Sequence, residues 1–198
     1  MFTGIIEALG TIQTVSIDRT NRIFWIKSGI SSQLKIDESI SHNGVCLTIE
    51  DIKDDIHRIT AIRETLEKTN LQNWKEGDII NLERSMQMNG RIDGHIVQGH
   101  IDGTGKCISK KDLGGSVEYI FSFDEDKAVL IIEKGSICIN GVSLTAFNVT
   151  KNTFTVAIIP YTFEHTNFKN IKEGDIVNLE FDMLGKYVAR MVNLNGMK

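Results

Sequence analysis

Short stretches rich in β-branched and apolar residues alternate with turn residues along most of the chain. In the first half these stretches are residues 10–15, 23–26, 45–49, 56–62 and 78–82. Stretches of this length, bounded by Gly, Asn and Asp, are typical of β-strands. Asn43-Gly44 and Asn140-Gly141 favour tight hairpin turns because Asn and Gly tolerate positive φ, although either dipeptide alone indicates only a turn. We therefore expect small all-β domains in which six strands close as a Greek-key barrel, which removes exposed sheet edges.

The pattern changes near the C-terminus. Apolar residues there recur at three- and four-residue spacing, at Leu184, Tyr187, Val188, Met191 and Leu194. This spacing predicts one amphipathic α-helix over residues 183–198, with an apolar stripe along one face. Two partners for the stripe stay open: the protein's own barrel, or copies of the same helix in an oligomer.

The chain also contains a tandem repeat. At an offset of 97 positions, residues 75–83 align with residues 172–180 with one position different, and residues 43–48 align with 140–145. An offset of 95 aligns residues 4–7 with 99–102. A period of this length, present only twice, indicates two similar domains rather than a solenoid. We place the first domain at residues 1–94, the second at 95–182 and the helix at 183–198, with a glycine-containing linker over 86–94.

The composition excludes several classes of partner. The 22 basic and 26 acidic side chains give a formal net charge of -4 without a run of Lys or Arg, which argues against nucleic acid. No apolar stretch has the length of a membrane span, and the N-terminus lacks the features of a signal peptide, so we expect a cytoplasmic protein without a membrane partner. The three cysteines have no Cys-x-x-Cys spacing, and we expect reduced thiols rather than disulfides or a zinc site.

A duplicated domain indicates two copies of one ligand, or two related ligands, in similar pockets. Thr48 and Thr145 occupy the same place in the two halves and are candidates to hold the same ligand group. A strand threonine that satisfies its own hydroxyl locally explains both residues equally well.

Positions at which the halves differ are candidates for distinct roles. His100 stands opposite Ile5, Cys46 opposite Ser143, and Arg63-Glu64 opposite Pro160-Tyr161. The ordinary pKa of histidine, about 6.5, makes His100 the candidate proton shuttle, the alternative being a surface or structural residue. For Cys46, a place in an apolar strand favours a small buried hydrophobe over a nucleophile.

The sequence offers no metal or nucleotide motif. His95 and His100 are five residues apart and lack a third ligand at metal spacing, so we predict no metal site. Gly99, Gly103 and Gly105 have neither the spacing nor the following helix of a dinucleotide-binding or P-loop motif.

Several segments, taken in order, resemble one known family. They are residues 1–7, both Asn-Gly-Val-Cys/Ser-Leu-Thr segments, residues 94–103 and residues 182–187. Together they are similar to the riboflavin synthase α-chain family of lumazine-binding barrels, over the whole length of the chain. The resemblance implies two six-stranded barrels and a C-terminal helix, assembled as a homotrimer through those helices. It also implies a pocket where the N-terminal barrel of one subunit faces the C-terminal barrel of its neighbour.

The resemblance implies a reaction as well. A four-carbon unit passes from one molecule of 6,7-dimethyl-8-ribityllumazine to a second, and the products are riboflavin and 5-amino-6-(D-ribitylamino)uracil. This chemistry asks for proximity and orientation, for proton removal from the methyl group on C7, and for nucleophile addition at C7 of the partner molecule. It needs no metal and no organic cofactor, and lumazine synthase is a candidate protein partner.

The family's site residues fall on positions of this chain that match its motifs. The resemblance implies a catalytic role for Cys46, His100, Ser143 and Thr145, with Ser39 nearby. In the N-terminal barrel the implied ligand contacts are Gly4, Ile5, Ile6, Cys46, Leu47, Thr48, Thr60, Ala61, Ile62, Arg63, Glu64 and Thr65. In the C-terminal barrel they are Gly99, His100, Ile101, Lys134, Ser143, Leu144, Thr145, Ile158, Ile159, Pro160, Tyr161, Thr162 and Phe163.

One departure from the family pattern and two other functions qualify this expectation. Asn140 stands where many family members place an aspartate, which puts a proton-transfer role at that position in doubt. The first alternative function is a non-catalytic lumazine-binding antenna of the kind found in bioluminescent bacteria, whose members typically lose catalytic positions that this chain keeps. The second is a flavin-storing barrel pair.

Overall fold

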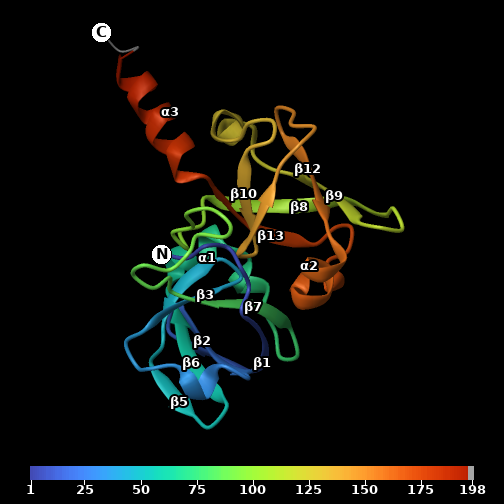
Figure 1. Ribbon diagram of the computed structural model, residues 1–198. Coiled ribbons are helices and arrows are strands. Elements are labelled where there is room, and N and C mark those ends of the chain that lie inside the picture. The colour runs from blue at the N-terminus through green and yellow to red at the C-terminus, as the bar shows by residue number, and fades with distance from the viewer. Residues whose placement is uncertain (196–198) are drawn as a thin grey trace.

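The computed structural model describes residues 1–195 and consists of two antiparallel β domains with a helix projecting from the second (Figure 1). The first sheet has the strand order β4-β3-β7-β1-β2-β6-β5. Its neighbours β3 and β7, and β2 and β6, are far apart in sequence, as in a Greek key. The strands are β1 (Ala8–Asp18), β2 (Asn21–Ser28), β3 (Ser39–His42), β4 (Val45–Thr48), β5 (Asp51–Lys53), β6 (Ile56–Ala61) and β7 (Ile79–Arg84).

The second sheet repeats the first, with the order β11-β10-β13-β8-β9-β12. A register shift bends β1 between Ile12 and Thr14, and another bends β8 between Cys107 and Ser109, so the long strand of each domain curls at the same place. The strands are β8 (Gly103–Asp112), β9 (Val117–Ser122), β10 (Ser136–Ile139), β11 (Val142–Thr145), β12 (Thr153–Ile158) and β13 (Ile176–Phe181). The prediction of two similar all-β domains is confirmed, although the first sheet has a seventh short strand, β5.

The predicted C-terminal helix is confirmed as α3 (Met183–Asn195), and residues 196–198 of the predicted range lie outside the described residues. Short helices that the sequence analysis did not predict follow β6 and β12. These are α1 (Arg63–Lys68) and α2 (Pro160–His165), and the 3-10 turns are Ser31–Gln33, Asn70–Asn73, Glu125–Leu130 and Asn167–Asn170.

Both predicted Asn-Gly turns are confirmed. Asn43 and Asn140 have φ of 47°, and the following glycines have φ of 83°, so each pair connects two strands by a tight turn with positive φ. The two turns lie against each other, because a Cβ on Gly44 would stand 2.9 Å from the backbone nitrogen of Gly141. The equivalent turns of the two repeats therefore meet where the domains join.

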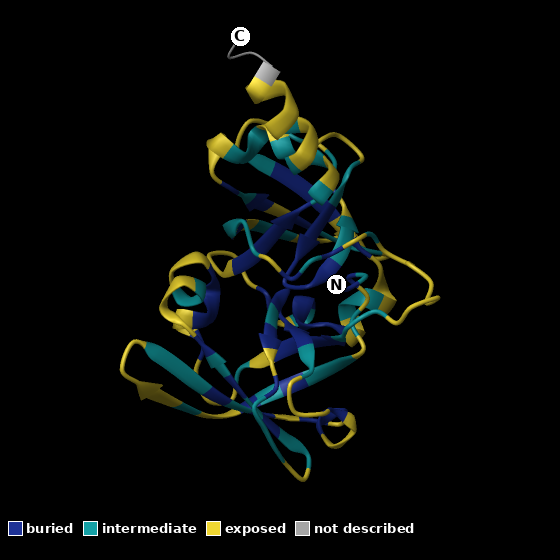
Figure 2. Cartoon of the chain, turned by 90° about the vertical axis from the view of Figure 1, so that its left-hand side faces the viewer, coloured by how far each residue is buried: buried dark blue, intermediate teal, exposed yellow. Residues whose placement is uncertain are grey.

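Each domain has its own apolar interior, seen as buried strands in Figure 2. In the first, Phe24 meets Trp74 edge to face, with 5.3 Å between ring centroids. The second is more aromatic, and the hydroxyl of Tyr119 satisfies its polar end by donating to the carbonyl of Phe168 at 2.8 Å. Separate cores allow each domain to form its own ligand cavity.

The first interior contains a buried polar chain that the second lacks. Nδ1 of His42 lies 3.2 Å from the carbonyl of Ile40, Nε2 of His42 lies 3.0 Å from Nε2 of His57, and Nδ1 of His57 lies 2.8 Å from Oγ of Ser31. All these contacts are satisfied when both imidazoles are neutral and Ser31 donates to His57. The repeat places Ala128, Ile139 and Phe154 at the equivalent positions.

This chain of contacts predicts a loss of stability in mild acid. Burial and the neighbouring His57 hold the pKa of His42 well below its usual value, and burial lowers the pKa of His57 from 6.5 to about 4. As the pH falls, these histidines take up protons in the unfolded chain before they do so in the folded protein. Their neutral forms therefore stabilise the fold fully above the pKa of the unfolded chain, and this stabilisation is lost as the pH falls from about 6.5 toward 4. His57 alone then contributes a loss of about 3 kcal/mol.

The control is a triple variant, Ser31→Ala, His42→Ile and His57→Phe, which places the equivalent residues of the second domain in the first. Urea unfolding of wild type and variant between pH 7.5 and 4.5 measures the effect. We expect the free energy of unfolding of the variant to depend less steeply on pH. Equal slopes for the two proteins would contradict the assignment.

Candidate functional site

The leading segment of each half, residues 4–6 in the first half and 99–101 in the second, crosses to the other domain. Phe2 and Val97 pair as an antiparallel bridge, and from there the two segments diverge. The backbone N–H of Ser143 donates to the carbonyl of Gly4 at 2.8 Å, and that of Cys46 donates to the carbonyl of Gly99 at 2.9 Å. Residues 4–6 therefore lie against the second domain, and residues 99–101 against the first.

This exchange corrects the sequence-based placement of both segments. Gly4, Ile5 and Ile6 were expected in the first barrel, and Gly99, His100 and Ile101 in the second; both assignments are wrong. The crossing is close, since a Cβ on Gly4 would stand 2.6 Å from Cβ of Ser143, and one on Gly99 would stand 2.6 Å from Cβ of Cys46. Both glycines also have positive φ, which other residues rarely adopt.

One cavity of about 230 Å³ opens in the first domain, between β4, α1 and the crossing segment. His100 comes from the second half of the chain and Cys46 from the first, so the exchange unites the two residues in one cavity. Cys46 is half-buried and packs with Phe2 and Val97. The lining residues are Val45, Cys46, Glu64, Thr65, Lys68, Thr69, Gly99, His100 and Ile101.

A second cavity of about 500 Å³ lies at the equivalent place in the other domain. The side chain of Lys134 belongs to it, with Nζ 4.7 Å from the centre of the Phe147 ring. The cavity thus combines a cation, an aromatic face and hydroxyl groups. Its lining residues are Ile5, Asp93, Gly94, Lys134, Ser136, Ser143, Leu144, Thr145, Phe147, Ala157, Ile159 and Thr162.

The remaining expected site residues lie outside these two linings. Leu47, Ala61 and Ile158 are buried in the barrel interiors, and Ile6 and Phe163 pack against the second one. Other side chains have partners of their own: Thr60 donates to Glu50, Arg63 pairs with Glu67, and Tyr161 stacks on His165. Ser39 faces Thr48 in the β3–β4 register, Pro160 begins α2, and Ile62 precedes α1 and is exposed.

Two buried carboxylates hold the crossing segments, and the sequence analysis had not identified them as site residues. Glu83 on β7 accepts from the N–H groups of Thr3 and Gly4 at 2.7 and 3.0 Å. Glu180 on β13 accepts from those of Gln98, Gly99 and His100 at 2.7, 2.9 and 3.0 Å. Burial raises the pKa of both carboxyl groups, and the backbone hydrogen bonds oppose that rise. Glu180 thereby fixes the backbone of His100 beside the first cavity.

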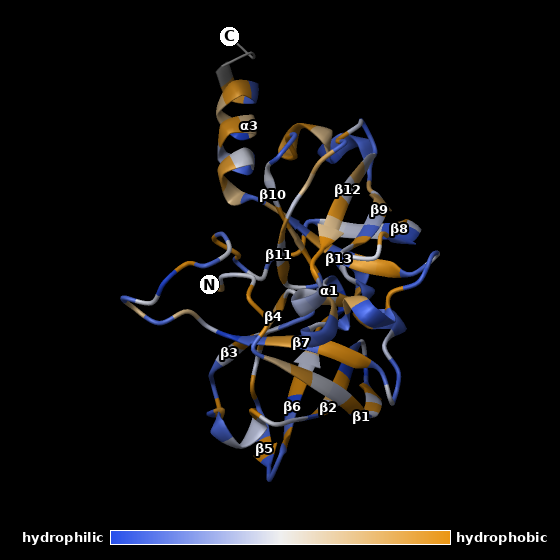
Figure 3. Cartoon of the chain, turned by 45° about the vertical axis from the view of Figure 1, so that its right-hand side comes forward, coloured by the Kyte–Doolittle hydropathy of each residue, from blue (hydrophilic) through white to orange (hydrophobic). Residues whose placement is uncertain are grey.

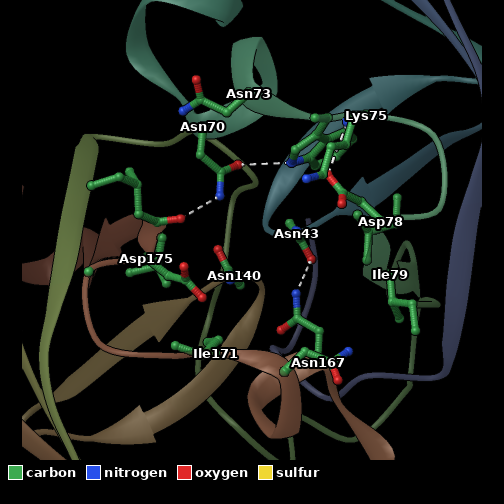
Figure 4. Close-up of a pocket in the computed structure, with 16 residues that line it drawn as sticks. Asn43, Asn70, Asn73, Lys75, Asp78, Ile79, Asn140, Asn167, Ile171 and Asp175 are labelled. Carbon is green, nitrogen blue, oxygen red and sulfur yellow. Dashed lines mark hydrogen bonds between the residues drawn. The ribbon is translucent and has the colours of Figure 1, made fainter.

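A third cavity, of about 440 Å³, lies where the domains join (Figure 4). Asparagines beside this cavity bond one another across the junction: the amide of Asn81 donates to Oδ1 of Asn167 at 2.9 Å, and that of Asn167 donates to Oδ1 of Asn43 at 3.0 Å. Oδ1 of Asn140 accepts from the N–H of Asn178 at 2.9 Å. The first two bonds join the repeats, and the third gives Asn140 a structural partner within the second domain.

Two further features are absent from the described residues. Within residues 1–195, no group of three or more His, Cys, Asp or Glu side chains is placed to hold a metal ion. Among the same described residues, no helix combines the length and the apolar character needed to cross a membrane.

Comparison with known proteins supports the repeat. The family profile "Lumazine binding domain" matches residues 3–85 and again residues 98–182. The chain is 38% identical over 194 residues to riboflavin synthase of Bacillus subtilis, covering 98% of this chain and 90% of that protein. It is 39% identical over 193 residues to riboflavin synthase of Actinobacillus pleuropneumoniae, covering 97% and 90%.

A solved structure shares the fold. LumP complexed with riboflavin superposes with a TM-score of 0.86 at 20% identity, covering 91% of this chain and 99% of that one. At this identity the likeness concerns the fold alone.

Proposed function

The chain belongs to the riboflavin synthase family of lumazine-binding proteins, and from this premise we propose that it converts two molecules of 6,7-dimethyl-8-ribityllumazine into riboflavin and 5-amino-6-(D-ribitylamino)uracil. The observation that carries the proposal is the pair of cavities, one in each repeat. A reaction whose donor and acceptor are the same compound needs two binding sites for that compound, and a duplicated domain supplies them. The domain boundaries at 94/95 and 182/183 stay predictions.

The two cavities differ in their reactive groups, which suits different roles for two identical ligands. The first holds Cys46 and His100; the second holds Ser143, Thr145 and Lys134. In the first, His100 moves a proton to or from the bound lumazine. In the second, Lys134 and the hydroxyl group of Thr145 orient the ring carbonyls and the ribityl chain.

Assembly as a homotrimer through α3 brings cavities of different protomers together. The helix carries a broad exposed apolar face (Figure 3), with Leu184 68%, Tyr187 63%, Val188 60% and Met191 63% exposed. A contiguous apolar face of this kind is typical of a protein–protein interface. The open alternative, that the stripe docks on its own barrel, is disfavoured by these exposures. Lumazine synthase stays a predicted partner, and the cytoplasm the predicted compartment.

The activity is tested by mixing the purified protein with 6,7-dimethyl-8-ribityllumazine and no other additive. We expect riboflavin absorbance to appear together with one equivalent of the aminouracil, because the lumazine is both donor and acceptor. Binding without product would instead support the antenna function, and neither binding nor product would contradict both functions.

A further inference from the structure

A hydroxyl–imidazole pair stands at the edge of the second cavity. Nδ1 of His95 lies 2.6 Å from Oγ of Ser143. Ser143 lines the cavity from β11, and His95 lies in the segment that crosses toward the first domain. The backbone fixes both residues, since the N–H of His95 donates to the carbonyl of Thr3 at 3.1 Å and the N–H of Ser143 donates to the carbonyl of Gly4.

The surroundings keep His95 able to accept a proton. Burial lowers its pKa, and the charge of Asp182 partly offsets that effect, so the ring is neutral near pH 7. Its Nε2 is buried and has no hydrogen-bond partner in the part of the chain that the structure describes. The contact with Ser143 is therefore the one hydrogen bond that orients this ring among the described residues.

The first domain has no equivalent of this pair. Cys46 takes the place of Ser143 in the repeat, so the hydroxyl group of the pair is missing there. An imidazole serves each cavity by a different route: His100 lines the first, whereas His95 reaches the second through Ser143. A partner found in one repeat only indicates a role that one ligand needs and the other does not.

We propose that His95 positions and activates Ser143 as the nucleophile for the lumazine bound in the second cavity, an inference that rests on the proposed function. Oγ of Ser143 forms a bond to C7 of the ring, the O–H bond breaks, and the proton moves to Nδ1 of His95. The displaced electron pair is taken up by the conjugated ring and its carbonyl groups. When Ser143 leaves again, the C–O bond breaks and the imidazolium returns the proton. Asp182 stabilises the imidazolium in between.

Two substitutions at His95 separate activation from simple packing. His95→Asn keeps an amide that can hydrogen-bond to Ser143 but cannot accept its proton, and His95→Ala removes both abilities. We expect both variants, and Ser143→Ala, to lower kcat by about 100-fold. The Kd for ribityl-lumazine and the melting temperature of His95→Asn should remain those of the wild type. Near-wild-type kcat for His95→Asn would overturn the proposal, because hydrogen bonding alone would then suffice.

A double-mutant cycle tests whether His95 acts through Ser143. If it does, adding His95→Asn to Ser143→Ala lowers kcat no further, since the hydroxyl that the imidazole activates is already gone. A further loss of similar size in the Ser143→Ala background would overturn the proposal. The wild type decides the proposed function separately: if it makes no riboflavin, that function fails, whereas an active wild type with an active His95→Asn protein contradicts only the inference.

Discussion

A protein in which His100 is replaced by glutamine is expected to form riboflavin about 100-fold more slowly than the wild type, with an unchanged Kd for ribityl-lumazine. Glutamine keeps a polar side chain of similar reach but cannot exchange a proton near neutral pH. The backbone of His100 should stay in place, because its N–H group is bonded to Glu180 and not to a side chain of the cavity. Steady-state kinetics and equilibrium binding together measure the two effects.

The control is His165→Gln, which changes the same residue type away from both cavities. Nδ1 of His165 contacts the carbonyl of Tyr161 at 2.8 Å on the surface of α2. We expect this variant to keep full activity. If His100→Gln instead weakens binding as much as turnover, His100 orients the ligand and the proton shuttle must be another group.

Placing charges on the apolar face of α3 is expected to abolish the proposed trimer and, with it, the activity. A protein with both Val188→Asp and Met191→Asp would have to bury two carboxylates in the helix interface. Burying unpaired charges is so unfavourable that the subunits should stay apart. Because the proposed assembly brings together cavities of neighbouring protomers, riboflavin formation should fall by at least about 100-fold. Sedimentation analysis and activity at equal protomer concentration measure both results.

Asn193→Asp provides the matched control, because Asn193 is exposed on a different face of the same helix. It adds a charge without placing it on the apolar stripe, so assembly and activity should remain. A monomeric double variant with full activity would show that one protomer holds the whole reaction site. A monomeric wild type would exclude the helix-mediated trimer.

The sequence predicted those parts of the fold that follow from local rules. The Asn-Gly turns need positive φ, which these residues adopt readily, and their predicted geometry is confirmed. The three- and four-residue spacing of apolar residues predicted α3 for the same kind of reason. In contrast, β3 was missed because its sequence is Ser-Ile-Ser-His, whose polar residues are buried by partners from distant strands.

The site was harder to predict because its geometry depends on residues far apart in the chain. The resemblance brought Cys46, His100, Ser143 and Lys134 into consideration. An alignment of the two repeats, however, does not reveal that the leading segment of each half lies against the other domain. Glu180 and Glu83 appeared as part of the repeat, but their contacts with residues about 80 positions earlier exist only in the folded protein. The pairing of His95 with Ser143 has the same origin, since 48 residues separate them.

Ligand stoichiometry tests the central claim of twin cavities most directly. The slow His100→Gln protein allows calorimetric titration with ribityl-lumazine before product accumulates. We expect two molecules bound per protomer, and one after either Cys46→Trp or Thr145→Trp fills a single cavity. A single molecule bound per protomer of the His100→Gln protein would contradict the account, because the second substrate would then have no site of its own.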